Sequence, residues 1–155
     1  KLTLAGVNVG QGLVRQGDGK LLLVGSVSPV PATARFLLKR LDVNGTPDAT
    51  FGNAGTVDTA FTQNAAAGGV ALQADGKIVV VGTRAFSVNA NFIVARYNAD
   101  GSADSGFGSD GNLSIDFFGF TDVGENVLVQ PDGKIVVSGL ATQNFDGYGL
   151  ARINP

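Results

Sequence analysis

Short apolar runs, each bounded by a polar turn and a glycine, recur along the chain at a fixed interval. Three turns share the pattern Gln-x-Asp-Gly-Lys, beginning at Gln16, Gln73 and Gln130, and each is followed by an apolar run that ends in glycine. The interval between these turns is 57 residues both times. A constant internal period of this length indicates a repeat architecture.

Each repeat reads as four β-strands, here called a to d. An Asp-Gly turn, which is a strong hairpin signal, links a to b. Strand b is apolar at successive positions, as expected of a strand covered on both faces, and strand c begins at Phe36, Phe92 and Tyr148. The pattern predicts strand a at residues 13–16, 70–73 and 127–130, strand b at 21–25, 78–82 and 135–139, strand c at 36–41, 92–97 and 148–153, and strand d at 56–59 and 112–116.

The sequence therefore predicts one all-β domain over residues 1–155, made of three four-stranded β-propeller blades of about 57 residues. The units are approximately residues 1–60, 61–117 and 118–155, with the strands offset at the ends. Residues 1–4 resemble residues 112–115, so the chain is expected to open with a strand d. Because propellers usually have four to eight blades, three blades are expected to be completed by another chain, as a six-bladed ring or an array, or by a longer parent chain.

The second repeat resembles a known family. It reads Gln-x-Asp-Gly-Lys-Ile-Val-Val-x-Gly from Gln73, then Phe-x-x-Ala-Arg-Tyr-Asn-x-Asp-Gly-Ser-x-Asp-x-x-Phe-Gly from Phe92. This is similar to the delta-sixty β-propeller repeat of bacterial proteins, and the resemblance covers nearly the whole chain. It implies propeller blades, usually in secreted or surface proteins, so an extracellular or cell-surface location is expected. The family has no established catalytic residues to carry over.

The amino-acid composition excludes several kinds of catalytic site and binding partner. The chain has no Cys, His, Met or Trp, which excludes Ser-His-Asp and Cys-His catalysis and zinc sites of the usual kind. With a net charge of −2 and interleaved charges, it has no basic patch for nucleic acid, and no apolar run is long enough to cross a bilayer. We therefore expect no catalytic residues, although carboxylates in the loops leave a hydrolase or lyase as an alternative.

Two loops have the pattern Asx-x-Asx-Gly-x-x-Asp, which places oxygen side chains around a tight turn as calcium loops do. Their oxygen-bearing residues are Asp42, Asn44, Asp48, Asn98, Asp100 and Asp104. The loops lack the longer calcium-binding framework with its bidentate Glu, and the same residues are ordinary turn formers. A structural turn is the favoured interpretation, calcium is the weaker one, and no other cofactor is expected.

An arginine occupies one position of every strand c: Arg40, Arg96 and Arg152. Alternation places Arg96 on the face of Phe92 and Val94, between blades. Since a buried arginine needs a partner, Asp48 and Asp104 in the following loops are the expected counter-charges. An anion-binding ring around the propeller channel is the alternative.

The repeats differ most in their b–c and d–a connections, which lie at one end of the blades. Variable loops on a rigid scaffold are where binding usually occurs. Five phenylalanines in these loops are candidate contacts for a glycan or protein ligand, unless they fill the core beneath: Phe61, Phe86, Phe118, Phe120 and Phe145. The sequence thus favours a non-catalytic extracellular binding scaffold. The alternative is a structural building block that joins blade to blade into rings or filaments.

Overall fold

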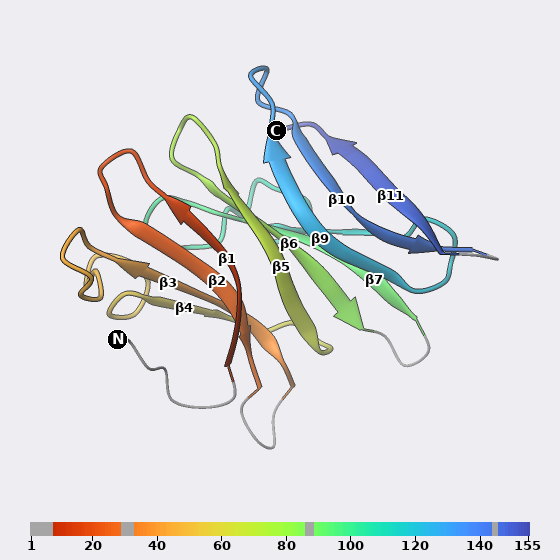
Figure 1. The fold of residues 1–155 in the computed structure, drawn as a ribbon, viewed down its shortest axis with the longest axis horizontal. Helices are drawn as coiled ribbons and strands as arrows, with labels where there is room; N and C mark the ends of the chain where they lie inside the picture. The colour runs from red at the N-terminus through yellow and green to blue at the C-terminus, as the bar shows by residue number, and fades with distance from the viewer. Residues whose placement is uncertain (1–7, 29–32, 86–88, 144–145) are drawn as a thin grey trace.

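The computed structural model describes residues 8–28, 33–85, 89–143 and 146–155, which form three antiparallel sheets without helices (Figure 1). The first blade contains β1 (Asn8–Arg15), β2 (Leu21–Val27), β3 (Arg35–Leu41) and β4 (Thr56–Thr59). The second contains β5 (Ala65–Leu72), β6 (Ile78–Ala85), β7 (Ala90–Tyr97) and β8 (Asn112–Ile115). The third contains β9 (Asp122–Val129), β10 (Ile135–Thr142) and β11 (Asp146–Ile153).

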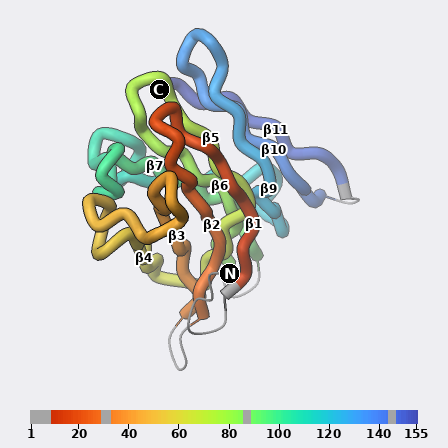
Figure 2. The backbone as a smooth tube through the Cα atoms, turned by 60° about the vertical axis from the view of Figure 1, so that its left-hand side comes forward, coloured from red at the N-terminus to blue at the C-terminus, as the bar shows by residue number. Residues whose placement is uncertain are grey.

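Strands pair in chain order within each sheet, which confirms the predicted blades. The sheets follow one another along the chain, so that the second blade lies between the other two (Figure 2). The strand d expected at residues 1–4 lies outside the described residues. In the described part of the chain, no helix is long and apolar enough to span a membrane.

The Asp-Gly turns join strands a and b as predicted. In the first turn the Gln16 N–H donates to Lys20 O (2.8 Å) and the Gly19 N–H donates to Gln16 O (3.0 Å), and the other two turns repeat these bonds. Gly19, Gly76 and Gly133 have φ of 90°, 85° and 81°. This is the three-residue hairpin in which a left-handed glycine follows the turn.

Strand a is longer than the sequence predicted. The small residues from Ala65 to Gly69 were expected to form a connection, yet they lie in β5. They are small because a neighbouring backbone packs against them: a Cβ added at Gly68 would lie 2.3 Å from Gly124 O in β9. Each strand a also carries a β-bulge, at Gln11, Gly68 and Glu125.

The core lies between the sheets. One cluster joins the first and second blades and includes Phe36, Leu38 and Val80, and a second joins the second and third blades and includes Phe92 and Val137. Both faces of β6 are therefore buried, as predicted for strand b. Antiparallel pairing puts the a–b turns and c–d loops at one end of the blades and the variable b–c and d–a connections at the other.

Candidate functional site

The c–d loops begin with a buried arginine. Arg40 Nε donates to Asp48 Oδ2 and Arg96 Nε donates to Asp104 Oδ2, both at 2.7 Å. Arg40 and Arg96 are each only 7% exposed, and Arg96 lies on the inter-blade face as predicted. The predicted pairing is therefore present in both complete loops, whereas Arg152 in β11 is exposed.

Two further contacts of these arginines were not predicted. The guanidinium of Arg40 lies 4.5 Å from the ring centroid of Phe51, and Arg96 lies 4.5 Å from that of Phe107. Arg40 Nη1 also donates to Ala99 O in the second blade (2.5 Å). The arginine therefore connects its own loop to the next blade, which a sequence pattern within one repeat does not indicate.

The lysine of the a–b turn completes this cluster. Lys20 Nζ donates to Asp48 Oδ2 at 2.8 Å, and Lys77 Nζ lies 3.7 Å from Asp104 Oδ2. The hydrogen bond from Lys20, followed by those from Thr50 and by the charge of Arg40, holds the pKa of Asp48 well below its usual value. The repeated lysine thus has a structural partner at the constant end of the blades.

The two aspartates among the calcium candidates of the first loop already have partners within the protein. Asp42 Oδ1 accepts the Asn44 and Thr46 N–H groups, and the bonds from Thr46 lower the pKa of Asp42. Asn44 is exposed, and the carboxylate of Asp48 is taken up by Arg40 and Lys20.

The second loop repeats this arrangement. Asn98 Nδ2 donates to Ser102 Oγ, and Asp100 Oδ1 accepts both the N–H and the hydroxyl of Ser102. Burial opposes ionisation of Asp104, but the Gly106 N–H and Arg96 lower its pKa overall. Among the described residues, no three acidic, histidine or cysteine side chains form a group able to hold a metal ion.

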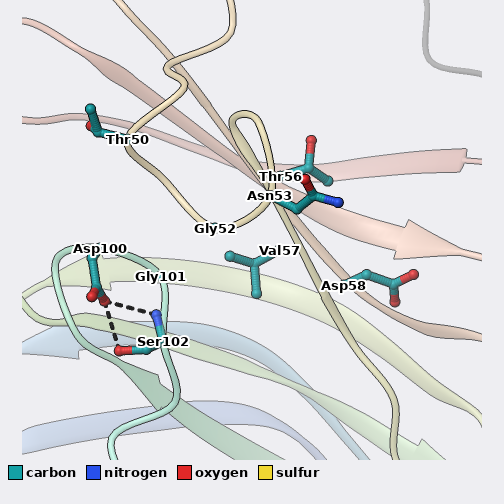
Figure 3. Close-up of a pocket in the computed structure, with 9 residues that line it drawn as sticks. All are labelled: Thr50, Gly52, Asn53, Thr56, Val57, Asp58, Asp100, Gly101 and Ser102. Carbon is teal, nitrogen blue, oxygen red and sulfur yellow. Dashed lines mark hydrogen bonds between the residues drawn. The ribbon is translucent and has the colours of Figure 1, made fainter.

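A groove lies between the c–d loops of the first two blades (Figure 3). The Gly52 N–H donates to Asp100 O (2.8 Å) across it, and a Cβ at Gly101 would lie 2.9 Å from a ring carbon of Phe51. Figure 3 shows the Asp100 carboxylate turned toward Ser102, within its own loop. The two blades are therefore in contact at this groove, and the Asp100 carboxylate beside it is already bonded within its own loop.

Three of the five aromatic candidates lie in the part of the chain that the structure describes, and they differ in exposure. Phe61 packs edge-on against Phe36, with ring centroids 4.9 Å apart, and so belongs to the core. Phe118 and Phe120 are exposed, at 51% and 48%. Phe86 and Phe145 lie outside the described residues.

The turn that carries the two exposed phenylalanines is held from several directions. Phe117, the first phenylalanine of this turn, packs edge-on against Phe92, with the ring centroids 5.1 Å apart. Asp116 Oδ1 accepts the Gly119 N–H (2.6 Å), and Asn89 Nδ2 from the neighbouring b–c connection donates to Gly119 O (2.6 Å). The backbone between the two exposed rings is therefore fixed.

A buried carboxylate supports the same turn. Asp122 is fully buried at the start of β9 and accepts the Phe117 N–H at 2.9 Å. The roles of Asn89, Asp116 and Asp122 were not predicted from the sequence. The signal available was the Asp-Phe-Phe-Gly run itself, because Asp at the first and Gly at the fourth position favour a β-turn.

The geometry of the three antiparallel sheets defines a repeat scaffold of the β-propeller class. The chain matches the family described as "Domain of unknown function (DUF5122) beta-propeller" over residues 16–51, 73–107 and 130–155. These segments cover more than half of the 155 residues, and the chain belongs to this β-propeller family. A search of curated proteins found no match.

The matched segments contain the a–b turns, strands b and c, and the arginine and aspartate of the c–d loops. Residues 108–129, which include the Phe118–Phe120 turn, lie outside them. The family match therefore includes the constant end of the blades together with the b–c connections, whereas the exposed aromatic turn lies outside it.

Proposed function

We propose that this protein is a non-catalytic binding scaffold that holds a glycan or protein ligand at the variable end of its blades. The observation that carries the proposal is the turn from Asp116 to Asp122, which presents Phe118 and Phe120 to solvent on a backbone fixed by its neighbours. Exposed aromatic rings on a preorganised loop provide contact area at a small entropic cost. We place the protein outside the cell or on its surface, which the resemblance to delta-sixty repeats supports.

The engagement of the carboxylates favours binding over catalysis. A hydrolase or lyase needs carboxylates free to exchange protons or attack a bond. Among the described residues, the following aspartates of the a–b turns and c–d loops bond within their own turns or pair with Arg and Lys: Asp18, Asp42, Asp48, Asp75, Asp100, Asp104 and Asp132. These side chains stabilise the blades, so we assign them no catalytic role and expect no cofactor.

A glycan array tests the proposal with wild type and with the double variant Phe118→Ala/Phe120→Ala. We expect the double variant to lose at least tenfold in affinity for any glycan the wild type binds, because exposed aromatic contacts supply the stacking surface. Its melting temperature should change little, since both side chains are exposed.

Val43→Ala is the matched control, because Val43 is 67% exposed at the opposite, constant end of the blades. It should leave binding unchanged. Equal glycan binding by wild type and the double variant would contradict the assignment of the site. No glycan binding by wild type would leave only a protein ligand, to be sought with the same pair of variants by affinity capture from culture supernatant or cell-surface extracts.

A further inference from the structure

The two interfaces between blades repeat the same arrangement of side chains. The side of a blade that meets the following blade is here called its forward face, and the side that meets the preceding blade its reverse face. Phe36 and Leu38 on the first forward face, and Phe92 and Val94 on the second, are fully buried. Forward and reverse faces of this repeat are therefore complementary to each other twice within one chain.

The forward face of the third blade exposes the equivalent positions. Tyr148 and Leu150 in β11 correspond to Phe92 and Val94 in the repeat, and they are 102% and 68% exposed. Leu128 in β9 pairs with Val136 in β10, which in turn pairs with Arg152 in β11. Leu128 therefore lies on the same face as Leu150, and it is 62% exposed. Large apolar side chains gathered on one sheet face are unusual in a monomer and mark an interaction surface.

On the reverse face of the first blade, apolar side chains of the described strands are also exposed. Leu13 is 63% exposed and Leu23 and Leu37 are partly buried, whereas Val80 and Ile93, which correspond to Leu23 and Leu37, are fully buried. An apolar hollow lies on this face, lined among others by Val9, Leu23, Gly25 and Leu37. This chain therefore carries both halves of the interface that its blades form internally.

The position of one aromatic ring shows how the halves fit. The edge of the Phe36 ring lies against Gly82, where an added Cβ would be 2.8 Å from Cζ of Phe36. In the first blade, Gly25 corresponds to Gly82. The three atoms nearest to a Cβ added at Gly25 all belong to the β1 backbone, whereas at Gly82 one of the three belongs to the Phe36 ring. Since Tyr148 corresponds to Phe36, its ring matches the hollow over Gly25.

We propose that the forward face of the third blade binds the reverse face of the first blade of a second copy of this chain. Tyr148 lies over Gly25 of the second copy, and Leu150 and Leu128 cover its Leu13, Leu23 and Leu37. The contact is head to tail, so it closes into a ring when two copies use both of their open faces and forms an open array otherwise. This inference does not depend on the proposed ligand site, because Phe118 and Phe120 lie on neither face.

Some positions differ from the internal interfaces and make this one weaker. The reverse face of the first blade has Lys39 where the second blade has Ala95, and a long cationic side chain there must keep its ammonium group in water. The Gly124 N–H donates to Thr83 Oγ1 between the second and third blades, but the residue corresponding to Thr83 in the third blade is Leu140. Association is therefore expected to depend on concentration in the micromolar range.

Sedimentation velocity from about 1 to 100 µM tests the proposal on the 155-residue chain. Wild type should reach at least twice the chain mass of 15.7 kDa. Tyr148→Ser and Leu13→Asp, each on a different face, should raise the dissociation constant at least tenfold. Both side chains are exposed in the single chain, so circular dichroism should show that both variants remain folded. Val43→Ser, at an equally exposed site on neither face, should associate as wild type does.

Mixing the two variants tests the head-to-tail geometry. Tyr148→Ser retains its reverse face and Leu13→Asp retains its forward face, so the mixture should form dimers that neither variant forms alone. A wild-type monomer over the whole concentration range would overturn the proposal, as would association that both substitutions leave unchanged. A mixture that stays monomeric while wild type associates would overturn the head-to-tail contact.

Discussion

Gly76 illustrates how a single residue fixes the a–b turn. Its φ of 85° lies in the left-handed region, and an added Cβ would meet only Ala99 Cβ at 3.6 Å, an ordinary contact. Gly76→Ala should therefore destabilise the fold through its backbone alone, by about 1 kcal/mol. The unfolding free energy from urea titration measures this.

Gly17→Ala is the matched control for that variant. Gly17 precedes Asp18 in the first turn, its φ is not positive, and the second turn already has Ala74 at this position. The control should be neutral or slightly stabilising. If both variants lose the same stability, the left-handed backbone is not the reason for glycine at position 76.

Gly76 and Gly68 are glycines for different reasons, and only the reason for Gly76 can be predicted from the sequence. The need for Gly76 is local, because an Asp-Gly pair between apolar runs specifies the turn. The need for Gly68 arises from Gly124, more than fifty residues away, whose backbone approaches it in the folded chain. Because the sequence does not reveal that neighbour, the residues around Gly68 are predicted to form a loop, although they lie in β5.

At the scale of the element, the c–d loop should depend on its aspartate. Since Lys20, Thr50 and Arg40 lower the pKa of Asp48 in the folded protein, its contribution to stability is fully present above the unfolded value of about 3.8. It is lost as the pH falls through the folded pKa. Asp48→Asn should therefore lower the melting temperature at pH 7 and reduce its fall as the pH drops from about 4 to about 2.

Asp110→Asn is the control, because Asp110 is exposed in the other c–d loop and asparagine tolerates its φ of 51°. It should follow the wild-type pH profile. Added calcium or EDTA should leave the melting temperature of wild type unchanged, because the loop carboxylates already bond within the protein. A clear loss of stability in EDTA that calcium restores would instead establish the loops as calcium sites.

The sequence predicted the arginine–aspartate pair because both residues recur in the repeat and a buried charge needs a partner. It did not predict that Lys20 joins them or that Arg40 reaches Ala99, because these contacts join elements whose distance only the fold determines. The same limit applies to the aromatic candidates. Alternation within a strand does not decide which loop phenylalanines turn inward, as Phe61 does, and which remain exposed.

At the scale of the whole molecule, the second blade is covered on both sides and the others on one. Amide hydrogen exchange should be slowest in β6 and β7, where Val79, Val80 and Ile93 are fully buried, and faster in β11, where Tyr148 and Leu150 are exposed. Mass spectrometry of peptides from each blade at low protein concentration checks this order. Uniform protection in all three blades would show that they open only as one unit.

The close approach of Gly68 in β5 to Gly124 in β9 has a consequence for the shape of the arc. Because main-chain atoms meet there without intervening side chains, the angle between the second and third blades is determined by the backbone. Substitutions in the connecting loops at the variable end can therefore accumulate without changing the curvature of the scaffold. A methyl group at residue 68 would push β5 and β9 apart, and the angle between these two blades would open.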